Sequence, residues 1–411
     1  MKKAVMYGAG NIGRGFIGQL LFESGYETVF IDVNIEILNK LNNDGKYPVN
    51  ILKGVESKEI IVENVRGVNG VDIAAVAKEI AEADIMATAV GVNVLPWIAK
   101  PIAEGLKKRW QNGNMSPLNI IICENLLDAN HYLAGLIKKE LTEAEKSKFD
   151  NLVGMVEASI GRMVPVMTTE MQQGNILRIC VEEYGELPVD KDGFKGDIPV
   201  IKNMLPFSPI SFYIQRKLFI HNMGHALTAY LGKLKGYTYI WEAINDTSIR
   251  SVSSKAMMDS ATALSIEHGI SLEILLEHVD DLICRFGNKQ LGDTVNRVGN
   301  DTKRKLSPND RLIGAANMCA KHGINPISIC VAIAAAMKFD QEPGSNLLGV
   351  HDMIADIGVE GTLDKICGLN EKSVIRDYVL EFYNLIDSNM GVDEIILGTE
   401  LKEKVGSNNV P

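Results

Sequence analysis

A glycine-rich motif close to the N-terminus constrains the fold of this chain more than any other feature. Residues 8–13 read Gly-Ala-Gly-Asn-Ile-Gly, directly after the short apolar run Lys3–Tyr7 and at the start of the helical pattern Ile12–Ser24. In such a strand–turn–helix context, the three glycines allow a tight turn, a close approach of backbone to a pyrophosphate, and close packing of helix on strand. The helix N-terminus then offers amide groups to phosphate. The residues expected to bind a dinucleotide are Gly8, Gly10, Asn11, Ile12 and Gly13.

The residue expected to choose the dinucleotide is Asp32, at the end of the next predicted strand. A carboxylate at this position binds the ribose hydroxyls and repels a 2′-phosphate, so we expect NAD rather than NADP. The alternatives are a purely structural glycine turn and a solvated carboxylate at a strand end. Val90 and Gly91, which end and follow another predicted strand, should line the nicotinamide side by analogy with other proteins of this fold.

The first half of the chain alternates short apolar runs with helical stretches. Such alternation predicts a parallel sheet with helices on both faces. Two later runs, Leu152–Glu157 and Asn175–Glu182, are expected to be further strands of the same or an attached sheet. The four main predicted strands are Lys3–Tyr7, Thr28–Asp32, Asp84–Val90 and Leu118–Cys123, and the helices between them include Ile12–Ser24 and Ile35–Asn43.

A domain boundary is expected between Glu186 and Ser211, where proline, glycine and mixed charge accumulate. Beyond it, apolar residues recur at helical spacing. A chain of 411 residues also exceeds one ordinary core. We predict an α/β fold, with a Rossmann-type domain over residues 1–200 and an all-helical substrate and catalytic domain over residues 205–400, before a frayed tail, Lys402–Pro411. The predicted helices are Phe212–Leu231, Ser248–His268, Ser271–Arg285, Asp310–Lys321 and Lys372–Ile386.

Composition limits the partners of the chain. Its formal net charge of −10 does not suit nucleic acid or an anionic membrane, so a bound anion needs a local basic cluster. No uncharged apolar run reaches the ~18 residues of a membrane-spanning helix, and the early glycine motif leaves no room for a signal peptide. The six cysteines are scattered without a CxxC pair, which indicates reduced thiols. We therefore expect a cytoplasmic protein, and the oligomeric state stays open.

The strongest candidate for chemistry is a polar cluster from Lys217 to His225 on a predicted helix. At about 100° per residue, Asn222 lies about 140° and His225 about 80° around the helix from Lys217, so the three share one broad face. A desolvated lysine can act as a general base, and an amide N–H can stabilise a developing alkoxide. A solvated helix face with a core histidine has the same pattern, and the helix alone does not separate the two interpretations.

Four motifs, in order, resemble those of the polyol-specific long-chain dehydrogenases. They are GAGNIGRGFIG at the N-terminus, CENLLDAN around Asn125, KLFIHNMGHA from Lys217, and RVGNDTKRKLSPNDRLIG from Arg297. The resemblance implies a Rossmann-type domain, a helical domain and a reaction without metal. It also implies that Lys217 is the catalytic base, that Asn125 and Asn222 flank the reacting oxygen, and that His225 binds the substrate. The resemblance also implies that Glu182 binds the substrate, and Glu183 is the alternative if the match shifts by one residue.

The segment 297–311 is the candidate phosphate site. Its cationic side chains face only two nearby carboxylates, Asp301 and Asp310, and arginine suits bidentate phosphate binding. A solvated loop between helices would have the same composition. With the resemblance, we expect mannitol 1-phosphate and fructose 6-phosphate as the substrate pair, although two of the cations could hold sugar hydroxyls instead, namely Arg297 and Lys305. The five cations are Arg297, Lys303, Arg304, Lys305 and Arg311.

Two rival functions remain open. One is a related oxidoreductase that acts on an unphosphorylated polyol or a hexuronate. The other is an NAD-binding sensor without catalysis, against which the intact set of Lys217, Asn222 and His225 argues. A zinc enzyme would need clustered ligands, whereas the seven histidines show no grouping outside the helix with Lys217.

Overall fold

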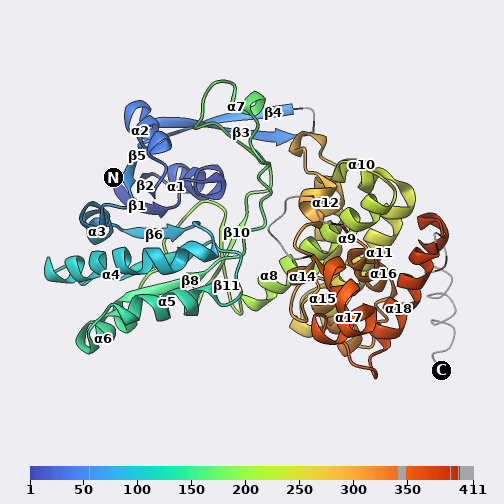
Figure 1. Cartoon of the computed structure of the whole chain (residues 1–411). Helices are drawn as coiled ribbons and strands as arrows, with labels where there is room; N and C mark the ends of the chain where they lie inside the picture. The colour runs from blue at the N-terminus through green and yellow to red at the C-terminus, as the bar shows by residue number, and fades with distance from the viewer. Residues whose placement is uncertain (55, 341–348, 389, 397, 399–411) are drawn as a thin grey trace. The chain divides into compact units, whose positions relative to one another are not determined.

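The computed structural model describes residues 1–54, 56–340, 349–388, 390–396 and 398, and the predicted tail Lys402–Pro411 lies outside them (Figure 1). The chain forms two compact units, Met1–Ile214 and Gln215–Pro411. The limits expected from the sequence, 1–200 and 205–400, stay a prediction.

A parallel sheet of six strands forms the centre of the first unit, in the order β5-β2-β1-β6-β7-β8. Five of its strands match predicted runs, and the sixth, β5, was not predicted because only its first residue is buried. The strands are β1 (Lys2–Tyr7), β2 (Tyr26–Asp32), β5 (Val65–Asn69), β6 (Ile85–Thr88), β7 (Leu118–Ile122) and β8 (Val153–Glu157).

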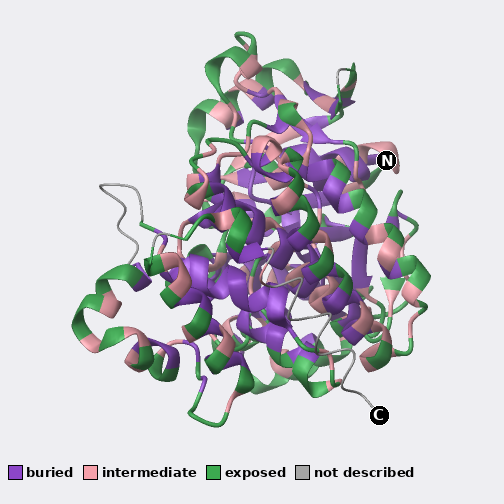
Figure 2. Ribbon diagram, turned by 90° about the vertical axis from the view of Figure 1, so that its right-hand side faces the viewer, coloured by how far each residue is buried: buried purple, intermediate pink, exposed green. Residues whose placement is uncertain are grey.

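Both faces of this sheet are covered, as predicted. Successive side chains of a strand point to opposite faces. Ala4 and Met6 of β1 belong to one apolar cluster, together with residues of α1, whereas Val5 and Tyr7 belong to a second cluster with α3, α4 and α5. Figure 2 shows the buried residues gathered on the strands and the inner faces of the helices. The helices of this unit are α1 (Gly18–Glu23), α2 (Ile35–Asp44), α3 (Ile73–Glu82), α4 (Leu95–Gln111), α5 (Ala129–Lys139), α6 (Glu143–Leu152), α7 (Thr169–Gln172) and α8 (Ser211–Gln215), with a 3-10 turn at Val92–Val94.

Two small sheets complete the first unit. Strands β3 (Lys46–Lys53) and β4 (Glu56–Glu63) pair antiparallel, and β9 (Ile179–Glu182) runs parallel to β3. The predicted strand Asn175–Glu182 is therefore right only in its last four residues, which lie in this attached sheet. β4 is almost wholly exposed and so has no apolar pattern to predict it. Strands β10 (Leu187–Asp190) and β11 (Met204–Phe207) form a parallel pair.

The second unit consists of helices throughout its described residues, as predicted, apart from one isolated bridge between Tyr239 and Thr294. At its centre, α16 is buried along its whole length and packs against α9, α11 and α18. The helices are α9 (Met223–Leu234), α10 (Ile240–Asn245), α11 (Thr247–His268), α12 (Leu272–Phe286), α13 (Val295–Gly299), α14 (Thr302–Lys305), α15 (Ile313–Lys321), α16 (Ile327–Met337), α17 (Val350–Lys365) and α18 (Val374–Asp387), with a 3-10 turn at Lys289–Leu291.

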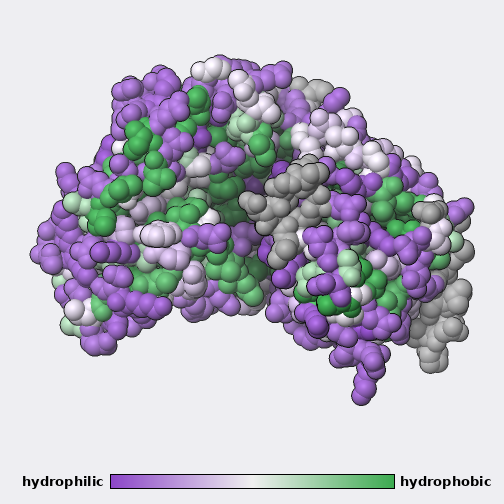
Figure 3. Space-filling view, in the orientation of Figure 1, coloured by the Kyte–Doolittle hydropathy of each residue, from purple (hydrophilic) through white to green (hydrophobic). Residues whose placement is uncertain are grey.

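The surface agrees with the composition. The face drawn in Figure 3 carries mostly hydrophilic residues, with apolar areas between them. No helix in the described parts of the chain is long and apolar enough to cross a membrane. All six cysteines are free thiols, and five of them are buried.

Candidate active site

The glycine loop has the close packing that its sequence predicts. Gly8 has a φ of 106°, and a Cβ atom there would lie 2.3 Å from the carbonyl oxygen of Ala89. A Cβ atom on Gly13 would lie 2.0 Å from the carbonyl oxygen of Gly8, so a side chain fits at neither position. In contrast, a Cβ atom on Gly10 would meet nothing within 4 Å. The loop is therefore held tightly at both ends and faces open space in its middle.

The two other predicted residues of this loop differ in surroundings. Asn11 is exposed, whereas Ile12 packs against the apolar cluster under the sheet. The helix then makes one π-helical turn at Gly13–Ile17 before it continues as α1. Thus Asn11 is open to a ligand, and the Ile12 side chain contributes to packing.

A cleft of about 760 Å³ opens beside the glycine loop within the first unit. Four predicted residues line it, namely Gly8, Gly10, Asp32 and Val90. A cleft of this volume lies within the range of ligand and cofactor sites. The structure therefore brings these cofactor candidates together around one cavity.

Three apolar side chains that no sequence pattern predicted also line this cleft. Val33, Val71 and Trp97 are 69%, 72% and 80% exposed, respectively. They stand alone in loops or at a helix start, where no apolar period marks them. A flat apolar ligand such as a nucleotide base would cover such exposed surface. The cleft therefore offers a polar lining for the phosphates and ribose of a dinucleotide and an apolar lining for its base.

Asp32 connects the end of β2 to the glycine loop. Its Oδ2 accepts a hydrogen bond from the Ala9 amide at 2.7 Å, and its Oδ1 accepts from the amides of Val33 and Asn34 at 2.8 and 3.0 Å. These bonds orient the carboxylate at the cleft and keep its negative charge there. A dinucleotide with a 2′-phosphate would meet that charge.

Glu124 is a second residue of this unit that sequence reasoning missed. Its buried carboxylate accepts hydrogen bonds from the consecutive amides of Val90 and Gly91, each at 2.9 Å. The amides of this predicted cofactor loop are therefore engaged by Glu124. The available signal was its position in CENLLDAN, directly before Asn125.

The two remaining candidates of the first unit lie in different surroundings. Asn125 is exposed in the loop after β7. Glu182 ends β9, is only 2% exposed, and accepts a short hydrogen bond from the Met163 amide. Its neighbour Glu183 forms an exposed ion pair with Lys53 at 2.8 Å. Of the two glutamates, Glu182 is the one held inside the unit.

The predicted catalytic helix is not a regular α-helix. Residues Arg216–Asn222 form a π-helix, and α9 begins at Met223. In a π-helix each hydrogen bond joins residues five apart, so its turn is wider than that of an α-helix. Lys217 and Asn222 are five apart, and the wider turn brings them nearer to one side than regular helical spacing predicts. Both side chains are half-buried.

The surroundings of Lys217 favour its neutral form. Burial and, second to it, the positive charge of Arg311 lower the pKa of Lys217 to about 8. The next polar residue, His221, is buried and has a pKa well below its ordinary value, because burial and then Arg285 oppose its charge. The helix therefore carries two side chains that lose their protons more readily than usual.

His225 is fixed on two sides. Its ring stacks on Phe286, with ring centroids 4.8 Å apart and planes 12° apart. Its Nε2 lies 3.2 Å from Oδ2 of Asp293. The Arg297 guanidinium donates to both oxygens of the same carboxylate, at 2.6 and 2.5 Å. The structure thus connects two predicted substrate-binding residues, His225 and Arg297, through an aspartate that the sequence analysis did not single out.

The basic segment contains more internal pairing than its sequence predicts. Arg304 and Arg311 both donate to Asp310, at 3.1 and 2.8 Å, and Arg304 also pairs with Asp301. In contrast, Lys303 is exposed and has no ion-pair partner among the described residues. Arg297 is paired with Asp293, as described above. Three carboxylates, rather than the two expected from the sequence, therefore offset the charge of the five cations.

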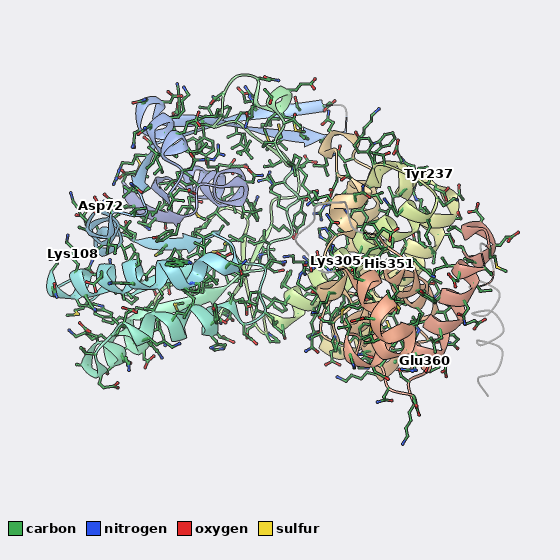
Figure 4. The ribbon with its side chains drawn as sticks, in the orientation of Figure 1. Asp72, Lys108, Tyr237, Lys305, His351 and Glu360 are labelled. Carbon is green, nitrogen blue, oxygen red and sulfur yellow. The ribbon has the colours of Figure 1, made fainter. Side chains whose placement is uncertain are left out.

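Lys305 is the buried member of this segment. It is only 5% exposed and is labelled among the helices of the second unit in Figure 4. Its ammonium group donates to the carbonyl oxygens of Val298 and Asn300. Burial lowers its pKa to about 7, helped by Arg311 and Arg304. Its hydrogen bonds therefore stabilise the turn between α13 and α14.

The candidates fall into two sets. The first unit holds the glycine loop, Asp32, Val90, Gly91, Asn125 and Glu182, and the second unit holds the lysine helix and the basic segment. Across the described ranges, no three His, Cys, Asp or Glu side chains form a group that could hold a metal ion. The expected independence of metal nevertheless stays a prediction.

Comparison with known families gives matches over most of the chain. Residues 2–203 match the mannitol dehydrogenase Rossmann domain, and residues 209–365 match the mannitol dehydrogenase C-terminal domain.

Known proteins match over nearly their whole length. The chain is 37% identical over 390 residues to mannitol-1-phosphate 5-dehydrogenase of Oceanobacillus iheyensis, covering 94% of this chain and 100% of the relative. It is 39% identical to the enzyme of the same name from Thermoanaerobacter pseudethanolicus, covering 93% and 97%. Among solved structures, the ternary complex of Pseudomonas fluorescens mannitol 2-dehydrogenase with NAD and D-mannitol superimposes with a TM-score of 0.74 at 15% identity, covering 98% of this chain and 94% of that one. That likeness shows a shared fold.

Proposed function

The chain belongs to the mannitol dehydrogenase family and is an NAD-dependent polyol dehydrogenase, and we propose that it interconverts mannitol 1-phosphate and fructose 6-phosphate. The observation that carries this proposal is the identity of 37–39% to mannitol-1-phosphate 5-dehydrogenases over more than nine-tenths of the chain. The mannitol 2-dehydrogenase of similar fold is only 15% identical.

The first unit would hold the cofactor. Gly10 and the open face of its loop leave room for the pyrophosphate, and Asp32 would bind the adenosine ribose. The exposed side chains of Val71 and Trp97 would cover the adenine. When bound, NAD supplies the acceptor for the hydride that leaves the polyol carbon, and NADH returns it in the reverse direction.

Lys217 would act as the general base. With a pKa of about 8, roughly a tenth of its amine is neutral at pH 7 and about half at pH 8, whereas an ordinary lysine is almost fully charged over this range. Neutral Lys217 takes the proton of the reacting hydroxyl during oxidation, and protonated Lys217 returns it to the ketose oxygen during reduction. This step needs no metal ion.

Asn125, Asn222 and His225 would position the substrate. The two amides would hold the reacting oxygen and stabilise the charge that develops on it. His225 would accept or donate a hydrogen bond at another hydroxyl, and Glu182 remains a predicted substrate contact.

The basic segment would capture the phosphate. A dianion gains nothing from a protein with a net charge of −10, so attraction must come from local cations. Lys303 is the best candidate because it is exposed without an ion-pair partner among the described residues, whereas Arg304 and Arg311 both pair with Asp310. Arg297 already binds Asp293, and Lys305 already binds the carbonyl oxygen of Val298. We therefore assign these two cations a smaller or an indirect role in binding the phosphate.

A substrate panel tests the proposal. The enzyme would be mixed with NAD or NADP and with mannitol 1-phosphate, mannitol, glucitol 6-phosphate or fructuronate, before and after exhaustive chelation. We expect NADH absorbance to rise fastest with mannitol 1-phosphate and to survive chelation. Equal kcat/KM for mannitol and mannitol 1-phosphate would instead favour the unphosphorylated-polyol alternative. The expected cytoplasmic location stays a prediction.

A further inference from the structure

The side chain of Asp293 lies between a candidate catalytic histidine and an arginine. Its Oδ2 is 3.2 Å from Nε2 of His225, and both of its oxygens accept from Arg297, at 2.6 and 2.5 Å. The Asp293 side chain is 12% exposed, whereas that of Arg297 is 51% exposed. A nearly buried carboxylate therefore joins the imidazole to a solvated guanidinium.

The position of the His225 ring leaves it little freedom. Phe286 stacks against one face of the ring, and the ring of His221 lies 6.1 Å away between centroids. The hydrogen bond to Asp293 then fixes rotation within the plane. The ring is held in one orientation, with Nε2 toward Asp293.

The carboxylate remains ionised. Burial raises the pKa of Asp293, but hydrogen bonds from His225 and Arg297 outweigh burial and hold this pKa below its ordinary value. An ionised carboxylate accepts hydrogen bonds and donates none. The imidazole nitrogen that faces it must therefore carry a hydrogen.

We propose that Asp293 is a positioning residue that sets the tautomer of His225 as Nε2–H, so that Nδ1 is free to accept a hydrogen bond from a substrate hydroxyl. In neutral imidazole, one nitrogen donates and the other accepts, and the partner of one nitrogen decides the role of the other. Arg297 contributes through Asp293, because its fork orients the carboxylate. The role toward substrate rests on the proposed function, whereas the tautomer does not.

A purely structural role for Asp293 makes a different prediction. The backbone carbonyl of Asp293 accepts from the Ile240 amide at 2.9 Å, and this bond anchors the loop before α13. Substitution of the side chain leaves that bond in place. A structural role would therefore lower stability without changing the tautomer of His225.

Asp293→Asn separates the two roles because Arg297 can only donate hydrogen bonds. The single oxygen of the new amide turns toward Arg297, and its NH2 group turns toward Nε2 of His225. Nε2 must then accept, which moves the hydrogen to Nδ1. We expect His225 to change from the Nε2–H to the Nδ1–H form without a change in its surroundings.

The first measurement is the NMR spectrum of the full chain with ¹⁵N-labelled histidines, in which His225→Ala identifies the His225 signals among the seven histidines. We expect the Nε2–H pattern in the wild type and the Nδ1–H pattern in Asp293→Asn. An Nδ1–H wild type, or an unchanged pattern in a folded variant, would overturn the proposal. The wild-type spectrum alone decides if Asp293→Asn does not fold.

The second measurement is a double-mutant cycle with mannitol 1-phosphate. Carboxylates that orient metal-bound histidines are worth roughly 10–100-fold in activity, and we expect a similar loss of kcat/KM in Asp293→Asn. In a His225→Ala background the same change should cost less than about twofold, because partners that act through each other are not additive. Additive losses would contradict the proposal. Inactivity of the wild type with mannitol 1-phosphate would refute the proposed substrate, but it would leave the tautomer result intact.

Asp364→Asn is the matched control. Asp364 binds Arg376 at 2.7 Å in the same unit, and no imidazole is among its partners. We expect this variant to keep both the His225 signal and kcat/KM at wild-type values.

Discussion

At the scale of single residues, Arg311 connects two parts of the candidate site. Its positive charge lowers the pKa of Lys217, the proposed base, and that of Lys305 in the basic segment. It also donates to Asp310 at 2.8 Å, which keeps it in place. One cation can therefore influence both proton transfer and substrate capture.

The pH dependence of the two reaction directions follows from Lys217. Its folded pKa of about 8 lies below that of an ordinary lysine, so the neutral base appears as pH rises through about 8. We expect kcat for oxidation to rise and kcat for reduction to fall over that interval, and Lys217→Ala to lose ~10²–10⁴-fold in kcat while NAD still binds. Steady-state rates of both directions, measured between pH 6 and pH 10, test this prediction. The interval covers roughly two pH units on each side of the deprotonation of Lys217.

Arg311→Gln tests the cause of the shift. Without this positive charge the pKa of Lys217 should rise, which moves the oxidation profile to higher pH. Arg250→Gln, at an exposed position of α11, makes the same charge change as a control and should leave the profile in place. A profile that stays fixed in Arg311→Gln would contradict the coupling.

Cofactor choice is also decided at one residue. Asp32→Asn keeps an oxygen that can accept from the Ala9 amide, but it removes the negative charge. The ratio of kcat/KM with NADP to kcat/KM with NAD should therefore increase by about tenfold or more. This factor corresponds to the free energy of one hydrogen bond to a charged group. Asp72→Asn is the control, since Asp72 caps α3 by accepting from the Ala75 amide at 3.0 Å and is absent from the cleft lining. An unchanged ratio in Asp32→Asn would place the cofactor preference elsewhere.

At the scale of secondary-structure elements, sequence patterns predicted the parts with a clear period or a clear motif. Five strands of the central sheet and the amphipathic helices of the second unit were found in this way. Helix α16 was missed because it is apolar on every side, and β4 was missed because it is exposed on nearly every side. Neither has the one-sided pattern on which the prediction depends.

The candidate site was predictable where its residues are close in sequence. Lys217, Asn222 and His225 fall within one helix, and the glycines fall within one loop. Glu124 and Asp293 act on residues far from them in the chain, through contacts that only the fold creates. No spacing rule relates such pairs, so the sequence could not single them out.

Glu124 sets the shape of the loop after β6. Glu124→Gln replaces one accepting oxygen with an NH2 group that faces an amide donor, so either the Val90 or the Gly91 amide loses its partner. Loss of one such hydrogen bond costs about 0.5–1.5 kcal/mol, and we expect weaker binding of NAD together with a lower melting temperature. Isothermal titration and thermal unfolding measure both.

Glu104→Gln serves as the control for that variant. Glu104 pairs with Lys107 on α4 at 2.9 Å and is 41% exposed, so its loss should change neither quantity appreciably. If Glu124→Gln behaved like this control, Glu124 would have no part in shaping the loop.

At the scale of the whole molecule, substrate capture works against the net charge. The chain carries −10, so a phosphate must be recognised by a few cations that are not already neutralised. Lys303→Ala should therefore raise KM for fructose 6-phosphate far more than KM for free fructose, since truncating one partner of a charged contact costs ~2–5 kcal/mol if that contact is buried in the complex. Steady-state kinetics with both ketoses measure the difference.

Lys372→Ala removes an exposed lysine before α18 and tests whether net charge alone matters. It should leave both KM values unchanged. Equal effects of Lys303→Ala on the two ketoses would remove Lys303 from phosphate recognition.

The π-helix at Arg216–Asn222 also limits how the length of this chain can vary. A wide turn differs from a regular one by a single residue, because its hydrogen bonds span five residues instead of four. Deletion of one residue here would restore hydrogen bonds that span four residues, so the wide turn absorbs the change and α9, with His225, keeps nearly the same orientation relative to Lys217. Loss of one position in the regular helix, between Met223 and His225, has no such reserve and would rotate His225 by about 100° relative to Lys217. The wide turn therefore marks the one place along this helix where the chain length can change by a residue and the lysine still faces its partners.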